Sequence, residues 1–221
     1  MKNVFISFSL LFLTFSMQSQ NRIVDKPIIF NENRTLLTLE YLETHYGLKQ
    51  VEPTITPKII VLHWTNIPTL KKSFQAFYKE KLPNWRPDIK NASSLNVSSH
   101  FLVDQDGTIY RLMPETIMAR HVIGLNHCAI GIENVGGNKG NPLTQKQQEA
   151  NIWLVNYLAK KYAIDYVIGH YEYTNFENHE LWLEKDKGYR TYKVDPGKKF
   201  LKAVKEATKQ YSFKPTPQNK N

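Results

Sequence analysis

The chain has 221 residues, of which 41% are hydrophobic and 22% charged, and a formal net charge of +9. That length suits one domain with a full hydrophobic core, and the composition excludes a wholly disordered or membrane-embedded protein. A single cysteine, Cys128, excludes an internal disulfide, so packing or a metal must hold the fold. The positive charge favours an anionic surface or polymer as partner, although the basic residues form no continuous run.

Residues 1–20 form a segment of their own. Lys2 gives a positive start, an almost wholly apolar run follows from Val4 to Phe15, and small or polar residues end the segment. This pattern is typical of a secretory signal peptide. A retained membrane anchor is the less favoured alternative, because the run is shorter than the ~20 residues a spanning helix needs. We therefore expect export to the periplasm or the extracellular space, no integral membrane domain, and a cell-wall partner in preference to nucleic acid.

Residues 21–57 are predicted to form an N-terminal extension that packs on the main domain. Gly47 is a natural helix end, and four apolar residues before it recur at helical spacing: Leu36, Leu39, Leu42 and Tyr46. Pro53 and Pro57 then mark a linker.

The main domain is predicted over residues 58–211. Its first strand is the continuous apolar run Lys58–His63, which fits a strand buried on both faces. A helix is expected around Leu70–Lys79. Residues Ser98–Leu112 predict a hairpin that turns at Asp106-Gly107, and another strand follows over Ala129–Val135.

The second half of this domain alternates helix and strand. Thr144 and Gln147 form a capping box at the start of a long helix, a short strand covers Tyr166–Gly169, and a last helix runs from Gly197 to Tyr211. The polar tail 212–221 is predicted to be disordered. Together the elements predict a single α/β domain with a central mixed β-sheet flanked by helices.

Two histidines follow directly after buried strands. His63 ends the first strand and His170 follows the strand over Tyr166–Gly169. Side chains at the carboxyl ends of such strands commonly face a ligand crevice, so both are candidate metal ligands. Either one taken alone is more often a structural histidine with its hydrogen bonds satisfied.

The segment Lys193-Val-Asp195-Pro-Gly supplies a candidate carboxylate. Asp195 stands before a Pro-Gly turn that begins the last helix, so helix capping is the simplest interpretation of this residue. Capping does not account for Lys193, which lies on the same face as Asp195 if the segment is extended.

Two histidines and one carboxylate with an open fourth position make a hydrolytic zinc site. Such a site needs a second carboxylate as general base and acid. Glu133 is the candidate, because it is the single acid within an otherwise apolar strand. An edge-strand glutamate that faces solvent is an equally favoured interpretation of Glu133.

Six motifs occur in an order that resembles a known family. They are Val-Leu-His63-Trp-Thr, Ser-Ser-His100-Phe-Leu-Val-Asp-Gln-Asp-Gly, Ala119-Arg-His121, Ile130-Gly-Ile-Glu133, Ile168-Gly-His170 and Lys193-Val-Asp195-Pro-Gly. Over residues 58–206 the chain resembles the type 2 N-acetylmuramoyl-L-alanine amidases, which are related to phage amidase-type lysozymes and peptidoglycan recognition proteins.

The resemblance implies zinc-dependent hydrolysis of the amide bond between N-acetylmuramic acid and L-alanine, with peptidoglycan or a muropeptide as substrate. It implies a zinc ion held by His63, His170 and Asp195 at the floor of a substrate groove. Glu133 would act as base and proton shuttle, and Lys193 would stabilise the oxyanion. His100 and His121 match motifs that line or support the groove and are not assigned as ligands.

One segment departs from the family pattern. The stretch from Tyr171 to Tyr192 is longer than in many relatives and rich in aromatic residues. It is interpreted as an added loop that faces the substrate, with simple packing over the sheet edge as the alternative. A third ligand within it, such as His179, is less favoured because Lys193 and Asp195 keep the family motif intact.

Two other functions are weighed against the amidase. A non-catalytic peptidoglycan-binding module is the main alternative, although the metal set looks complete. A cysteine hydrolase that uses Cys128 and His127 is disfavoured, because neighbouring residues on a strand point to opposite faces.

Overall fold

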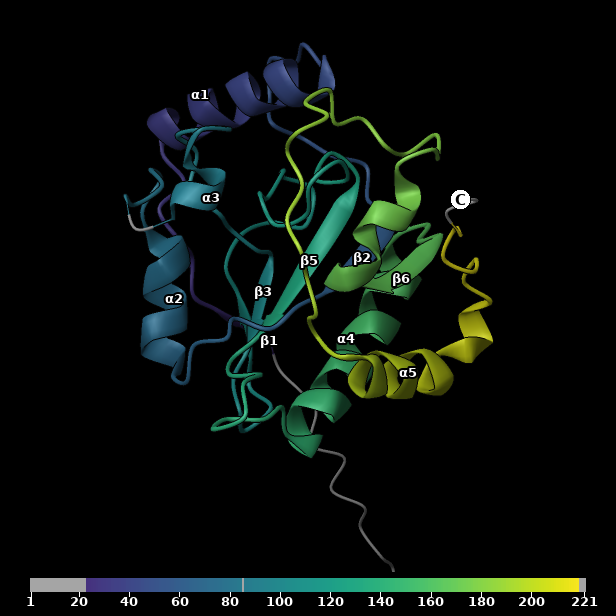
Figure 1. The fold of residues 1–221 in the computed structure, drawn as a ribbon. Coiled ribbons are helices and arrows are strands. Elements are labelled where there is room, and N and C mark those ends of the chain that lie inside the picture. The colour runs from purple at the N-terminus through teal and green to yellow at the C-terminus, as the bar shows by residue number, and fades with distance from the viewer. Residues whose placement is uncertain (1–22, 85, 219–221) are drawn as a thin grey trace, which may run out of the picture.

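The computed structural model describes residues 23–84 and 86–218, which form a six-stranded sheet with helices on both faces (Figure 1). The predicted signal peptide 1–20 lies outside the described residues. Within the part of the chain that is described, no helix is both long enough and apolar enough to cross a membrane.

The sheet is mixed, as the sequence predicts. In spatial order its strands are β1 (Ile23–Asp25), β4 (Ile109–Arg111), β3 (Phe101–Val103), β5 (Ala129–Asn134), β2 (Ile59–Leu62) and β6 (Tyr166–Gly169). The hairpin of β3 and β4 is antiparallel, and every other neighbouring pair is parallel. The carboxyl ends of β2, β5 and β6 therefore meet at one edge of the sheet.

The helices are α1 (Glu32–Tyr41), α2 (Leu70–Tyr78), α3 (Pro87–Lys90), α4 (Gln145–Lys161) and α5 (Lys198–Ala207). Shorter helical turns cover Leu42–Tyr46, His170–Phe176 and Lys209–Tyr211. The predicted capping box of α4 is confirmed: the amide of Gln147 donates to the Thr144 hydroxyl over 3.1 Å, and the Gln147 side-chain oxygen accepts from the Thr144 amide over 3.0 Å.

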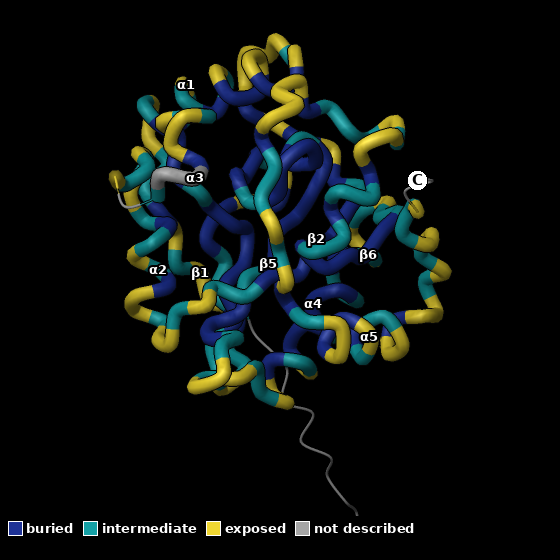
Figure 2. Tube along the Cα trace, viewed as in Figure 1, coloured by how far each residue is buried: buried dark blue, intermediate teal, exposed yellow. Residues whose placement is uncertain are grey.

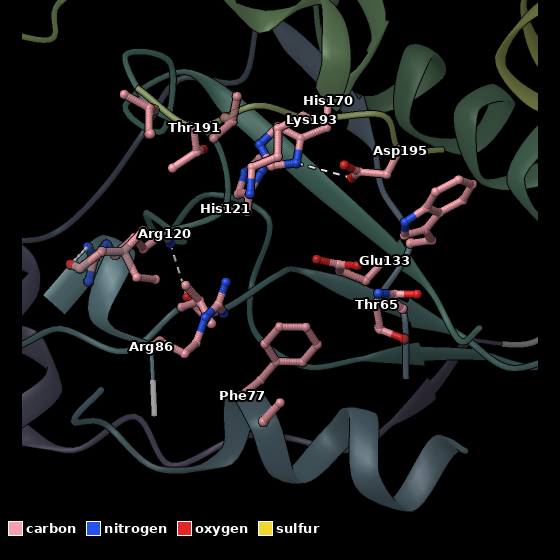
Figure 3. Close-up of a pocket in the computed structure, with 18 of the residues that line it drawn as sticks. Thr65, Phe77, Arg86, Arg120, His121, Glu133, His170, Thr191, Lys193 and Asp195 are labelled. Carbon is pink, nitrogen blue, oxygen red and sulfur yellow. Dashed lines mark hydrogen bonds and ion pairs between the residues drawn. The ribbon is translucent and has the colours of Figure 1, made fainter. Parts of the chain in front are cut away.

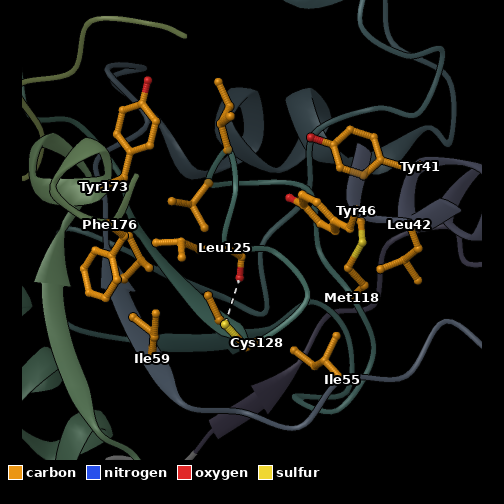
Figure 4. Packing of buried hydrophobic residues seen from close by; sticks show 14 of the residues in the cluster. Tyr41, Leu42, Tyr46, Ile55, Ile59, Met118, Leu125, Cys128, Tyr173 and Phe176 are labelled. Carbon is orange, nitrogen blue, oxygen red and sulfur yellow. Dashed lines mark hydrogen bonds between the residues drawn. The ribbon is translucent and has the colours of Figure 1, made fainter. Parts of the chain in front are cut away.

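Both faces of the central strands are buried, which explains the continuous apolar run of β2. Ile60 and Leu62 pack on one face with side chains of α4 and α5 such as Leu154 and Leu201. Ile59 points to the other face, where α1, the turn after it and the loops before β5 cover the sheet (Figures 2 and 4).

The N-terminal extension differs from its prediction in two ways. Ile23–Asp25 forms the edge strand β1, paired with β4, which the sequence analysis does not predict. The inner face of α1 also differs, because Leu36 is 59% exposed and Arg34 and Thr38 are buried instead. Arg34 is turned inward because its guanidinium donates to the Phe77 carbonyl over 2.9 Å and so caps the end of α2.

The predicted disordered tail is ordered at its beginning. Phe213 packs partly buried against the cluster under α4 and α5. The Lys214 amide donates to the Asp165 carbonyl over 2.8 Å, and its ammonium lies 3.1 Å from the Asp165 carboxylate. The prediction for residues 212–221 is therefore wrong at these two positions, where one aromatic ring and one ion pair hold the chain against the domain.

Candidate metal centre and active-site groove

The two candidate histidines are brought together by the sheet. Strands β2 and β6 pair in parallel with Leu62 opposite Gly169, so the next residue of each strand, His63 and His170, leaves the same edge. Their Nδ1 atoms lie 2.9 Å apart, and both side chains are buried.

Asp195 completes the cluster. Its Oδ2 atom lies 3.1 Å from Nδ1 of His170 (Figure 3). The same oxygen lies 3.3 Å from Nδ1 of His63. Burial raises the pKa of Asp195, but its contacts with His170 and then His63 outweigh burial and hold the pKa well below its usual range. Burial lowers the pKa of His170 to about 4, so this ring is neutral at pH 7 and its nitrogen lone pair is free to bind a cation.

These three donors fit a small divalent ion. Tetrahedral zinc with bonds of about 2.0 Å would separate its ligand atoms by about 3.3 Å, close to the 2.9, 3.1 and 3.3 Å observed here. Among the described residues, this cluster of His63, His170 and Asp195 is the group found suitable for holding a metal ion. His179, the alternative third ligand, is engaged elsewhere, since its Nε2 lies 3.1 Å from the Tyr166 hydroxyl.

A chain of hydrogen bonds orients the first of these histidines. Nε2 of His121 lies 3.2 Å from the Ala129 carbonyl, which can only accept, so His121 donates there and its Nδ1 is left as an acceptor. Nδ1 of His121 lies 3.0 Å from Nε2 of His63, so His63 donates to it and keeps a lone pair on Nδ1, the atom that faces Asp195.

Gly131 explains how His121 reaches that position. A Cβ atom at Gly131, in the middle of β5, would lie 2.8 Å from the His121 ring. His100 lies behind His121 and is fixed as a neutral structural residue: its Nδ1 accepts from the Gly131 amide, and its Nε2 donates to the Ile117 carbonyl. The motifs of His100 and His121 predicted that both residues line or support the groove. The contact between His121 and His63 could not be predicted from the sequence.

Glu133 faces a groove. Strand β5 lies between β3 and β2, so the edge-strand interpretation of this residue is wrong. Ile130 and Ile132 point towards α4 and α5, while Glu133 points the other way into a cavity of about 520 Å³ that also contains His170 and Asp195. Its Oε2 atom is buried without a hydrogen-bond partner among the described residues. Burial raises the pKa of Glu133 to about 7.

The segment over residues 191–195 forms one wall of the same groove. Lys193 and Asp195 both line it, as the motif predicts, and Tyr192 at its rim is 91% exposed. Lys193 lines the groove together with Glu133 and His170, and its positive charge acts on both.

The longer loop over residues 171–192 mostly packs inward. Tyr173, Phe176 and Tyr189 are buried in the core on the groove side of the sheet. Trp182 lies so close over Gly124 that a Cβ there would be 2.5 Å from its ring. Of the substrate-facing loop that the sequence suggests, only Tyr189, Thr191 and Tyr192 line the groove.

Cys128 has no catalytic setting. Its thiol is buried and donates to the Leu125 carbonyl over 3.5 Å (Figure 4). Burial raises the pKa of Cys128 to about 12, so the reactive thiolate is absent at neutral pH. This setting argues against a cysteine hydrolase.

Several solved structures are similar to this chain, and the first of them shares its fold. The amidase LysC from Clostridium intestinale URNW is 21% identical, with 87% of this chain and 99% of that chain covered and a TM-score of 0.52. The endolysin LysCS from the same organism is 24% identical over 69% and 82% of the two chains, with a TM-score of 0.44. Human PGRP-IBETAC, solved with glycosamyl muramyl pentapeptide, is 19% identical, with 69% of this chain and 85% of that chain covered and a TM-score of 0.48.

A comparison with curated protein sequences finds no match. The family model described as N-acetylmuramoyl-L-alanine amidase matches residues 53–198, which include every candidate residue of the cluster and the groove. The chain belongs to the N-acetylmuramoyl-L-alanine amidase family and is a hydrolase of this peptidoglycan-cleaving class.

Proposed function

We propose that the protein uses zinc to hydrolyse the amide bond between N-acetylmuramic acid and L-alanine of peptidoglycan. The observation that carries this proposal is the convergence of His63, His170 and Asp195, of which His170 and Asp195 line a groove that also holds Glu133. The family match supports the reaction class.

His63, His170 and Asp195 would hold the zinc ion through two ring nitrogens and one carboxylate oxygen. These three side chains would supply the three protein ligands that hydrolytic zinc sites combine with a fourth position for water or substrate. When bound, zinc supplies a Lewis acid for the carbonyl oxygen and lowers the pKa of a water molecule to about 7.

Glu133 would move the protons of the reaction. Apart from Asp195, it is the one carboxylate among the described residues that line the groove. It takes a proton from the attacking water as general base and passes it to the nitrogen of L-alanine as the amide bond breaks.

Lys193 would stabilise the negative charge that develops on the scissile carbonyl oxygen. Lys193 lines the same groove as Glu133 and His170, and its charge acts on both. Removal of one such donor commonly costs about 3 kcal/mol of transition-state stabilisation.

Digestion of purified peptidoglycan tests the proposal. The mature protein should release peptides with a free L-alanine amino terminus, detected by mass spectrometry. A chelator should stop the release, and zinc should restore it. Zinc-loaded protein that pellets with peptidoglycan but releases no peptide would contradict the hydrolysis and favour a binding module.

We also propose that residues 1–20 direct export and are then removed. The support is the sequence pattern of a charged start, a short apolar run and a small-residue exit. Expression of the full chain with a C-terminal tag, followed by amino-terminal sequencing, tests this. An intact Met1 on protein that stays in the cytoplasm would contradict it.

A further inference from the structure

A second cavity of about 480 Å³ lies beside α2 and is basic. We call it the lysine pocket; its lining includes Ile67, Lys71, Lys72, Lys79, Lys81 and Asn96. None of its lining residues is acidic, and the four lysines are exposed.

The lysines of this pocket have no carboxylate partner among the described residues. Some lysines elsewhere do: Lys161 pairs with Glu115 and Lys205 with Glu172. The acid nearest in sequence, Glu80, accepts from the Asn33 side chain over 3.3 Å and forms no salt bridge with these lysines, although the charge of Lys81 acts on it. The pocket is therefore free to bind an anionic group.

Asn96 provides an independent indication of a ligand. It is only 2% exposed, and its side-chain nitrogen donates to the carbonyls of Ala76 and Lys79 over 3.0 and 2.8 Å. Those two bonds fix the orientation of the amide, and its Oδ1 atom is left without a donor among the described residues. A buried amide oxygen is rarely left unpaired, so a donor supplied by a ligand would satisfy it.

The lysine pocket adjoins the active-site groove, because Ile67 and Ala76 line both cavities. Because the two cavities share these residues, a stem peptide held in the groove has a direct path into the lysine pocket.

We infer that the lysine pocket binds the carboxylate-bearing distal part of the peptidoglycan stem peptide; this inference rests on the proposed function. A peptide supplies both features the pocket lacks: carboxylates for the lysines and a backbone N–H for Asn96. A phosphodiester polymer supplies the negative charge but no donor in the charged group itself.

A charge-reversal pair tests the inference. Lys72→Glu/Lys79→Glu changes the lysine pocket, and Lys198→Glu/Lys202→Glu makes the same change of charge on exposed positions of α5 outside both cavities. Pelleting with insoluble peptidoglycan at 4 °C measures binding. One sample keeps its free carboxylates, and the other has them converted to methyl amides.

We expect the pocket variant to bind native peptidoglycan about tenfold more weakly than the wild type, and the α5 variant within about twofold. On amidated peptidoglycan all three proteins should bind alike. Equal loss in both variants, or unchanged binding of the pocket variant, would overturn the inference. So would undiminished wild-type binding to the amidated wall with displacement by poly(glycerol phosphate), which would assign the pocket to a phosphate polymer.

Peptide release measured on the same samples separates this inference from the proposed function. If the wild type binds through the lysine pocket but releases no peptide, the inference stands and the amidase proposal fails. If it releases peptide while both double variants bind like the wild type, the proposed function stands and the pocket assignment fails.

Discussion

The two faces of the sheet are built from the same strands but satisfy their polar groups differently. Under α4, the buried amides are paired: Gln147 donates to the carbonyls of Val103 and Val135, and Asn151 bonds to Asn134. On the groove face, Glu133 Oε2, Arg120 Nε and Thr191 Oγ1 are buried without a partner among the described residues, whereas beside α4 this holds for Arg111 Nε.

This difference indicates that one face of the sheet mainly stabilises the fold and the other mainly binds ligands. Unpaired buried polar atoms cost stability and are rare, so they mark a place where a ligand is expected. The face under α4 and α5 should therefore respond to substitution mainly through stability. The groove face should respond mainly through chemistry and metal binding.

Glu133→Gln should give the largest effect. The substitution keeps the size of the side chain and removes the base, so the rate of peptide release should fall about 10³-fold. Zinc content should stay at one ion per chain and the thermal midpoint should not fall, because burial of an unpaired carboxyl is unfavourable. Metal analysis and calorimetry alongside the digestion check this, and activity within tenfold of the wild type would contradict the assigned role.

Leu154→Ala tests the other face. Leu154 is fully buried under the sheet, so its truncation should cost about 2–5 kcal/mol of unfolding free energy. The rate per folded molecule should remain that of the wild type. Urea unfolding measures the loss, with the exposed Lys160→Ala on the same helix as control. A stable Leu154→Ala variant with a damaged rate would reverse the proposed division between the faces.

His121→Leu should weaken zinc binding about 10- to 100-fold, as is usual for a residue that orients a metal ligand. The substitution removes the acceptor for His63 Nε2 and so releases the tautomer that presents Nδ1 to the metal. Competition with a chromophoric chelator measures the affinity without any turnover. His121→Gln offers an acceptor oxygen and should recover part of the affinity; equal affinity in all three proteins would exclude a positioning role.

The sequence predicted the structure best where a strand is marked by a continuous apolar run of its own. The apolar runs before His63 and His170 predict buried strands, and parallel pairing then brings both histidines to one edge. The direction of Glu133 could not be predicted in this way, because it depends on the strands that flank β5. Strand β1 was missed because three residues at a sheet edge, with Val24 and Asp25 exposed, carry almost no pattern.

Contacts between residues far apart in the chain could not be predicted from the sequence, for a different reason. The sequence gives no sign that Arg34 is buried, yet its guanidinium lies inside the fold and donates to a carbonyl at the end of α2. His45 and Glu184 are 139 residues apart and meet only because the loop over residues 171–192 folds back on the extension. Such pairs depend on the assembled fold, which local propensity does not encode.

The contact between His45 and Glu184 gives the smallest expected effect, a change of stability with pH. Nδ1 of His45 lies 2.8 Å from Glu184 and Nε2 lies 2.9 Å from the Ala92 carbonyl, so only the doubly protonated ring donates to both. Burial lowers the pKa of His45, but the bonds to Glu184 and Ala92 outweigh burial, and the pKa is raised. The nearby charge of Arg120 opposes this rise without reversing it.

Because the folded-state pKa of His45 is raised, its stabilisation is fully present below the unfolded value of about 6.5 and is lost as pH rises through the folded-state pKa. The wild type should therefore exceed His45→Gln in unfolding free energy by on the order of 1 kcal/mol more at pH 5.5 than at pH 8.5. Urea unfolding of both proteins at the two pH values measures this. The metal cluster also responds to pH, but it does so in both proteins, so the difference between them isolates His45. A difference that stays constant with pH would show that His45 is neutral and that the loop is held by packing alone.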